Sequence, residues 1–309
     1  QPIKKESHIN MLNKKLLLSL LIVCFLTVIT ACKRDSITMI IPYGGPQFAQ
    51  LYMQNDKDYE TTIVEGADPL VAAFGSEAYD VICAPTNLGA KLYDSKATYQ
   101  LIASVTWGSF YLASTSEISL ANIDQSDIIA FGKNQTPDAI LSYILNGNSI
   151  ESNVTYLDSL SSVVSSFVLD SSKIYLLSEP ALSVLNQTHE INIIDLQIEY
   201  ETLSGKSSYP QASIFAHKDL SDLKIVNIKK DLETSIQNLG DKQEESAKLA
   251  VELGINMLEN VIIGAIPRFN IRYVESIDAK DDIIFYLELL QAFNSKFIGE
   301  ALPNDSFYR

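Results

Sequence analysis

The sequence predicts an α/β protein of two lobes, each a mostly parallel sheet flanked by helices. Short apolar runs that suit buried strands are repeatedly followed by a turn and a helical segment. Five of these turns carry a proline at or near the start of the helix. Beyond the strand predicted at Gln211–His217 the pattern changes to amphipathic helices. Helices that return after a second α/β lobe usually pack on the first, so we expect two crossings and a two-strand hinge.

The stretch Tyr79–Tyr93 shows the strand–turn–helix pattern most clearly. Val81–Ala84 is an apolar run typical of a strand that is buried on both faces. Pro85, Thr86 and Asn87 form the turn, and apolar residues then follow at helical spacing. Ligands of open α/β sheets bind outside the carboxyl ends of the strands, which makes Thr86 and Asn87 candidate ligand-binding residues. Their alternative role is only to cap the helix.

Four more turns repeat this arrangement. They follow the strands predicted at Ile37–Tyr43, Thr61–Val64, Asp127–Phe131 and Ile174–Leu177. The turns themselves are Gly44-Gly45-Pro46, Gly66-Ala67-Asp68-Pro69, Gly132-Lys133-Asn134-Gln135-Thr136-Pro137 and Ser178-Glu179-Pro180. Five such turns in sequence indicate that the helix N-termini gather on one rim of the protein.

The order of the segments predicts the domain organisation. The first lobe is expected to comprise residues 37–115 and 215–309, and the second lobe residues 116–214. Tyr99–Ser114, broken at Trp107-Gly108, is interpreted as the first crossing, and Gln211–His217 as the return strand. The helices that follow are predicted at Leu223–Leu239, Gln243–Leu253 and Ile283–Phe293.

Composition limits the possible functions. The chain has 309 residues, of which 47% are hydrophobic and 20% charged, as in a globular protein. Its formal net charge is −15, with no stripe of lysine and arginine, which argues against a nucleic-acid partner. An acidic chain can still bind a small anion through a few oriented N–H groups.

The N-terminal segment reads as a targeting signal. Residues 1–10 precede Met11 and are expected to lie upstream of the true start, so that residues 1–31 hold these residues and a signal peptide. Lys14 and Lys15 are followed by an apolar run that is shorter than a membrane span needs. This run ends at Cys32, and residues 32–36 would form a short tether. The alternative is an ordinary signal peptide with an incidental cysteine.

The sequence offers little for catalysis. It contains no GxSxG, HExxH or CxxC motif. Once the signal is removed and Cys32 is set aside, one cysteine (Cys83) and two histidines remain, too few for a Cys/His metal cluster or a disulfide. We therefore expect no enzyme activity, no metal and no cofactor.

Several segments together resemble the ABC-transporter solute-binding proteins of the type II periplasmic fold. They are ITMIIPYGGPQFAQLYM, TTIVEGADPLVAAFGSEAYDVICAPTNLGAKLY, ASVTWGSFYLAS, LLSEPALSVL and AIPRFNIRYV, and the resemblance covers nearly all of the chain after the signal. Within that fold the chain is most similar to the branch that binds nitrate, taurine, alkanesulfonates and thiamine pyrimidine precursors. Ile29-Thr30-Ala31-Cys32 resembles a lipobox, which implies a diacylglycerol on Cys32 and lipid anchoring on the extracytoplasmic face of the cell membrane.

The resemblance implies that a solute binds between two lobes that close about a hinge, and that a monomer delivers it to an ABC permease. The ligand-binding residues it implies are Tyr43, Gly44, Gly45, Thr86, Asn87, Trp107, Gln135, Thr136 and Glu179. Lys133 is the evident basic residue in these loops, which argues against a simple inorganic anion. A neutral or weakly basic organic solute, including an aromatic one, stays open, and the sequence does not determine the charge of the solute.

Several of these residues have a second interpretation. Trp107 would stack on a flat ligand or pack in the hinge, and Tyr43 has the same two possibilities. Glu179 would pair with a cationic group of the solute or cap the helix that starts at Pro180. Arg268 is expected to be structural. For the whole chain, the alternatives to a transport protein are an enzyme on the same fold, like pyrimidine-precursor synthases, and a tethered sensor.

Overall fold

The computed structural model describes residues 36–93, 97–299 and 301–309 of the chain. Residues 37–309 form one compact unit. The predicted signal peptide, the lipidation site at Cys32 and the rest of the tether lie outside the described residues. Within the described part of the chain, no helix is both long enough and apolar enough to cross a membrane.

The first sheet, as far as the chain is described, has six strands in the order β11-β4-β10-β3-β1-β2. These are β1 (Ile37–Pro42), β2 (Tyr59–Val64), β3 (Val81–Pro85), β4 (Tyr99–Thr106), β10 (Ala212–His217) and β11 (Ile271–Glu275). The helices of this half are α2 (Gly45–Ala49), α3 (Leu51–Gln54), α4 (Asp68–Ser76), α5 (Thr86–Leu92), α10 (Asp222–Asp241), α11 (Gln243–Glu252), α12 (Glu259–Ala265) and α13 (Lys280–Phe293). Short 3₁₀ turns are η1 (Ile266–Arg268), η2 (Ser295–Phe297) and η3 (Asp305–Phe307).

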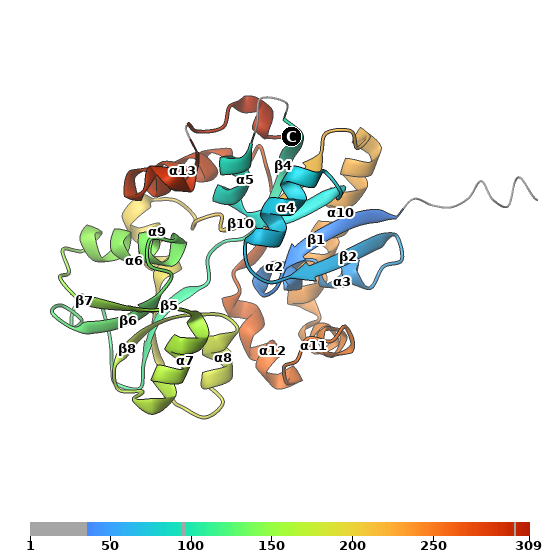
Figure 1. Ribbon diagram of the computed structural model, residues 1–309. Coiled ribbons are helices and arrows are strands. Elements are labelled where there is room, and N and C mark those ends of the chain that lie inside the picture. Colours follow the sequence, from blue (N-terminus) through green and yellow to red (C-terminus); the bar gives the residue numbers. More distant parts are fainter. Residues whose placement is uncertain (1–35, 94–96, 300) are drawn as a thin grey trace, which may run out of the picture. The chain divides into compact units, whose positions relative to one another are not determined.

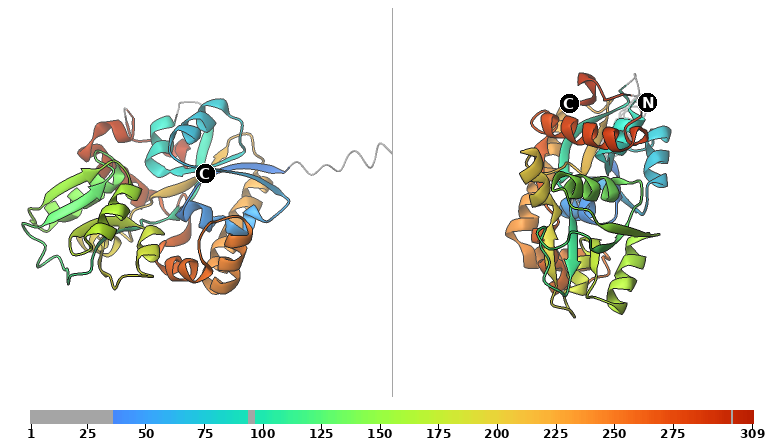
Figure 2. Two further views of the ribbon diagram at one scale, coloured as in Figure 1. Left: turned by 60° about the horizontal axis from the view of Figure 1, so that its bottom comes forward. Right: turned by 90° about the vertical axis from the view of Figure 1, so that its left-hand side faces the viewer.

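The second sheet has five strands within the described residues, in the order β7-β6-β8-β5-β9. These are β5 (Phe110–Ser114), β6 (Asp127–Phe131), β7 (Asn153–Leu157), β8 (Ile174–Ser178) and β9 (Asn192–Asp195). Its helices are α6 (Thr136–Gly147), α7 (Leu160–Leu169), α8 (Ala181–Leu185) and α9 (Leu196–Ser204). In Figures 1 and 2 the orange helices α10 and α11 lie with the first sheet, and the yellow-green helices α7 and α8 lie with the second.

The two-lobe α/β fold is confirmed, but the sheets are mixed rather than mostly parallel. β1 pairs in parallel with β2 and β3, and β6 does so with β7 and β8. β10 runs antiparallel to β3 and β4, β11 to β4, and β5 to β8 and β9. The reason is the chain path, because β4 leads out of the first lobe and its neighbour β10 leads back in, so the two run in opposite directions.

The apolar run Val81–Ala84 lies in β3, and its burial explains its composition. The exposed fractions of Val81, Ile82, Cys83 and Ala84 are 0–1%. Ile82 and Ala84 pack in one hydrophobic cluster, whereas Val81 and Cys83 pack in another. Successive side chains of a strand point to opposite faces of the sheet, so both faces of β3 are covered, as predicted.

Two segments join the lobes. The chain changes sheets between Thr106 and Phe110 on the way out, and between α9 and β10 on the way back. Gly108 on the first crossing has φ 84°, and a Cβ there would lie 2.5 Å from Tyr209 Cζ on the second. A glycine is therefore required where the crossings touch. Both changes of sheet fall a few residues before the predicted lobe boundaries at 115/116 and 214/215, which stay a prediction.

Most predicted helices form, and the missed elements have weak sequence signals. α7 spans Leu160–Leu169 and β10 covers the expected return strand. α9 was not expected, because Leu196–Ser204 has few apolar residues to mark a helical period. β11 was not expected, since Ile271–Glu275 is short and follows a helical stretch.

Candidate functional site

All five strand-to-helix turns border one cavity of about 610 Å³. Each contributes at least one residue, so the helix starts of both lobes meet there, as the sequence indicated. The cavity, called the cleft from here on, is lined by Pro42, Tyr43, Gly44, Gly45, Pro46, Ala67, Pro85, Asn87, Leu88, Lys91, Thr106, Ser109, Phe110, Phe131, Gln135, Thr136, Pro137, Ser178, Glu179, Gln211, Ala212, Lys296 and Phe297. Its volume lies in the range of small-molecule sites.

Seven of the nine predicted ligand-binding residues border the cleft. They are Tyr43, Gly44, Gly45, Asn87, Gln135, Thr136 and Glu179. Gly44 has φ 101°, a conformation that favours glycine at the β1–α2 turn. Whether these residues contact a solute stays a prediction.

Thr86 does not reach the cleft surface. Its side chain is fully buried, and its hydroxyl lies 2.8 Å from the hydroxyl of Ser213 on β10. Ser213 in turn lies 2.9 Å from Ser104 Oγ on β4. These small hydroxyls thus link Thr86, the first residue of α5, to β10 and β4, and Thr86 lies in this buried network rather than on the cleft surface.

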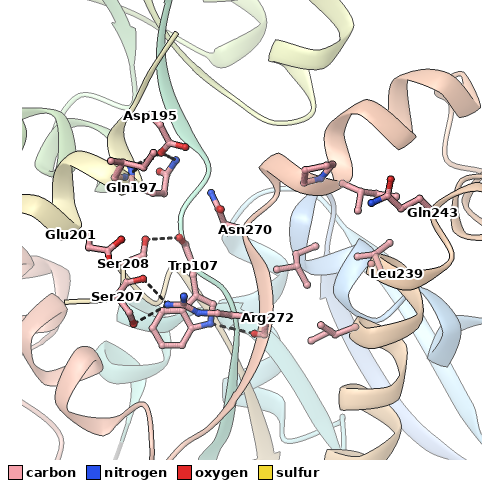
Figure 3. Close-up of a pocket in the computed structure, with 16 residues that line it drawn as sticks. Trp107, Asp195, Gln197, Glu201, Ser207, Ser208, Leu239, Gln243, Asn270 and Arg272 are labelled. Atoms are coloured by element: carbon pink, nitrogen blue, oxygen red, sulfur yellow. Dashed lines mark hydrogen bonds between the residues drawn. The ribbon is translucent and has the colours of Figure 1, made fainter. Parts of the chain in front are cut away.

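Trp107 also lies outside the cleft. It is 1% exposed, its indole N–H donates to the Arg272 carbonyl at 3.3 Å, and the Arg272 guanidinium lies 4.1 Å from its ring centroid (Figure 3). The neighbouring residue Thr106 borders the cleft, so successive residues of this crossing face opposite sides. Trp107 therefore packs in the hinge, the second of its two interpretations.

On the Trp107 side lies a second cavity of about 420 Å³, lined from α9, α10, η1 and β11 (Figure 3). Its polar groups are largely engaged within the protein. The Asp195 carboxylate accepts the N–H groups of Gln197 and Ile198 and caps α9. The Gln197 amide bridges the backbone N–H and C=O of Phe110 at 2.9 and 3.0 Å. Burial raises the pKa of Asp195 and lowers that of Arg272. We therefore take the cleft, and not this cavity, as the candidate site.

Glu179 is held by protein partners. Its Oε1 accepts from Arg268 Nε at 2.5 Å and from Ser183 Oγ at 2.9 Å, and its Oε2 accepts the Ser183 N–H at 3.1 Å. The last bond caps the first turn of α8, which favours the capping interpretation. Arg268 belongs to η1 of the first lobe, so this ion pair also joins the lobes.

The cleft contains groups that the sequence did not reveal. Lys91 and Lys296 border it, whereas Lys133 lies over the Tyr156 ring at 5.8 Å and does not line it. Lys91 is in α5, within the stretch Tyr79–Tyr93, and could have been found from helical spacing. Lys296 comes from η2, more than 200 residues away, and only folding brings it there.

Two buried polar atoms at the cleft have unused hydrogen-bonding capacity. Within the described residues, Thr106 Oγ1 and Gln211 Oε1 have no hydrogen-bond partner. Thr106 ends β4, Gln211 directly precedes β10, and both residues border the cleft. Because a buried polar group without a partner is costly, such atoms at a cavity are candidates to bind a ligand or water.

No model of a known protein family matches the chain, and no curated protein matches it either. Solved structures share its fold. An ABC transporter from Parabacteroides distasonis is 20% identical, with 89% of this chain and 99% of that one covered and a TM-score of 0.79. The periplasmic aliphatic sulphonate binding protein of Escherichia coli is 12% identical, with 87% of this chain and 89% of that one covered and a TM-score of 0.66. The alkanesulfonate-binding protein of Xanthomonas axonopodis bound to MOPS is 14% identical, with 83% of this chain and 94% of that one covered and a TM-score of 0.56. The resemblance to this fold is thus confirmed.

Proposed function

We propose that this protein is a non-enzymatic, extracytoplasmic solute-binding protein that captures a small organic solute in the cleft and delivers it to an ABC importer. The observation that carries the proposal is the convergence of all five strand-to-helix turns, from both lobes, on one cavity of about 610 Å³. A solute that contacts both lobes favours the closed arrangement of the lobes, because it binds that arrangement more tightly than the open one.

Other features support the same function. Thr106 Oγ1 and Gln211 Oε1 offer unused hydrogen-bonding capacity at the cleft. Structures of the same fold include an ABC transporter and two sulfonate-binding proteins.

Membrane tethering belongs to the proposal as well. The lipobox-like Ile29-Thr30-Ala31-Cys32 supports lipid anchoring, with the binding unit held beside a permease as a monomer. The tethered sensor would use the same cleft and the same anchor. A permease and an ATPase encoded next to this gene would favour transport, whereas a neighbouring receptor or kinase would favour the sensor.

The test is a thermal-shift screen of residues 33–309, which contain all described elements. The panel holds alkanesulfonates, taurine, nitrate, aminopyrimidines, thiamine, nucleobases and aromatic acids. Solute at about 100 times its Kd adds about 2.7 kcal/mol of stability, which raises the melting temperature by several degrees.

Bridging of the lobes is then tested with one variant from each. Phe297→Ala in the first lobe and Phe131→Ala in the second should each weaken binding of the hit by about tenfold. Leu169→Ala, at a position 87% exposed on α7, is the matched control and should bind normally. A well-folded protein with no hit, or a hit that neither phenylalanine variant affects, would contradict the proposal.

A further inference from the structure

The cleft is locally basic although the chain is acidic overall. Among the described residues that line it, the charged ones are Lys91, Lys296 and Glu179. Both lysines are exposed, and neither forms an ion pair within the described residues. The formal charge of the whole chain is −15, so a cleft with two lysines departs from the average surface. Such a local excess of positive charge attracts an acidic ligand.

The one carboxylate of the cleft is withdrawn from the solute. The Glu179 side chain is 0% exposed and is bound by Arg268 and by Ser183, through the bonds given above. Arg268 does not line the cleft, so it neutralises Glu179 from behind the cleft wall. A cationic solute group would have to compete with this guanidinium, and breaking a buried ion pair is costly.

Aromatic rings border the cleft from both lobes. Tyr43 and Phe297 belong to the first lobe, and Phe110 and Phe131 to the second. The ring centroids of Phe110 and Phe131 lie 6.2 Å apart in an edge-to-face arrangement. Rings on facing walls suit an apolar, ring-sized body, and the lysines at the cleft suit an acidic group attached to it.

We propose that the solute is an organic acid with an apolar, ring-sized body, and that Arg268 sets this charge preference by neutralising Glu179. This inference rests on the proposed function and gives the solute a charge, which the sequence had left open. Lys91 and Lys296 attract the acid, and Arg268 prevents Glu179 from attracting a base.

The first test is titration calorimetry of residues 33–309 at neutral pH with three probes that share a phenyl ring and differ in charge: phenylacetate, phenylacetamide and benzylammonium. Phenylacetate should bind at least tenfold more tightly than the other two probes, and added salt should weaken the binding of phenylacetate. Equal or tighter binding of the amide or the ammonium would overturn the inference while leaving the proposed function standing. Absence of phenylacetate binding at millimolar concentration would also overturn it, whereas the proposed function is judged by the broader screen.

The second test concerns Arg268. In Arg268→Gln the buried Glu179 loses its counter-charge, so the preference for phenylacetate over benzylammonium should fall by about tenfold. The double variant Arg268→Gln/Glu179→Gln removes both charges and should restore the preference, which a merely structural role would not do. An unchanged preference in folded Arg268→Gln would refute the role of Arg268.

The third test does not depend on the buried pair. Lys91→Gln and Lys296→Gln alter exposed side chains and should fold normally. Each variant should weaken the binding of phenylacetate by about threefold and leave the binding of phenylacetamide unchanged. Equal effects on the binding of phenylacetate and phenylacetamide would show that the lysines do not distinguish a charged solute from a neutral one. This result would overturn the inference even if Arg268→Gln fails to fold.

Discussion

Replacement of Trp107 by alanine tests the assignment of this residue to the hinge. The indole is 1% exposed, so the substitution deletes a fully buried aromatic group. A side chain of this size buries about 200 Å², and large-to-small core substitutions of this kind cost about 3–5 kcal/mol. The Arg272 guanidinium, 4.1 Å from the ring, also loses its stacking partner, which adds about 1 kcal/mol.

In a unit of this size the expected cost lowers the melting temperature by roughly 10 °C. The assay is thermal unfolding of residues 33–309 followed by far-ultraviolet circular dichroism. Tyr43→Ala is the matched control, because Tyr43 is 44% exposed at the cleft and its loss should cost about 1 kcal/mol or less. If Trp107→Ala melts within a degree or two of the parent protein, the hinge-packing assignment is wrong.

Trp107 also provides an optical check, since it is the one tryptophan of the sequence. A tryptophan that is 1% exposed should emit at short wavelength and resist quenching by iodide. Emission typical of a solvated indole in the native protein would contradict the packing on which the estimate of stability rests.

Three further predictions concern other residues. Burial raises the pKa of the Cys83 thiol to about 12, so in residues 33–309 about one thiol in ten thousand is ionised at about pH 8. Iodoacetamide should therefore alkylate Cys83 only after denaturation, and rapid native labelling, followed by mass spectrometry, would contradict its place in β3. Gly89→Ala should lower the melting temperature by several degrees, because a Cβ there would lie 2.1 Å from Phe215 Cζ and overpacking costs about 1–3 kcal/mol. Gly75→Ala is its control, because Gly75 is exposed and a Cβ there would have nothing within 4 Å. Equal stability of the two variants would contradict the packing of Gly89 against Phe215. Cys32→Ser in the full chain should release the protein from membranes in a fractionation assay, and retention would refute the proposed lipid anchor.

Much of the fold could be predicted because its signals are local. The apolar run of β3 requires burial on both faces, and the sequence shows this directly. Proline and polar residues at the helix starts identified all five turns, and with them 11 of the 23 residues that line the cleft. The directions of β4, β10 and β5 were predicted less well, because strand direction depends on where the chain crosses between sheets and not on local composition.

Two residues were predicted to bind the ligand because of their side-chain chemistry, which does not determine the side to which a side chain points. Thr86 and Trp107 have side chains suited to ligand contact, yet each faces away from the cleft. Their neighbours Pro85 and Thr106 border the cleft instead. Pro85 and Thr106 are the last residues of β3 and β4, and the sequence does not specify to within one residue which side chain at a strand end faces the cleft.

The sequence by itself determined the α/β class, the position of the five strand-to-helix turns and the acidic character of the chain. These depend on apolar patterning, turn chemistry and composition, which act over a few residues. Only the tertiary structure decided the charge of the cleft. Lys296 reaches it from the C-terminal part of the chain, and Arg268 meets Glu179 across 89 positions in sequence. Pairings between such distant residues follow from how the lobes pack, so the character of the site emerges only in the folded protein.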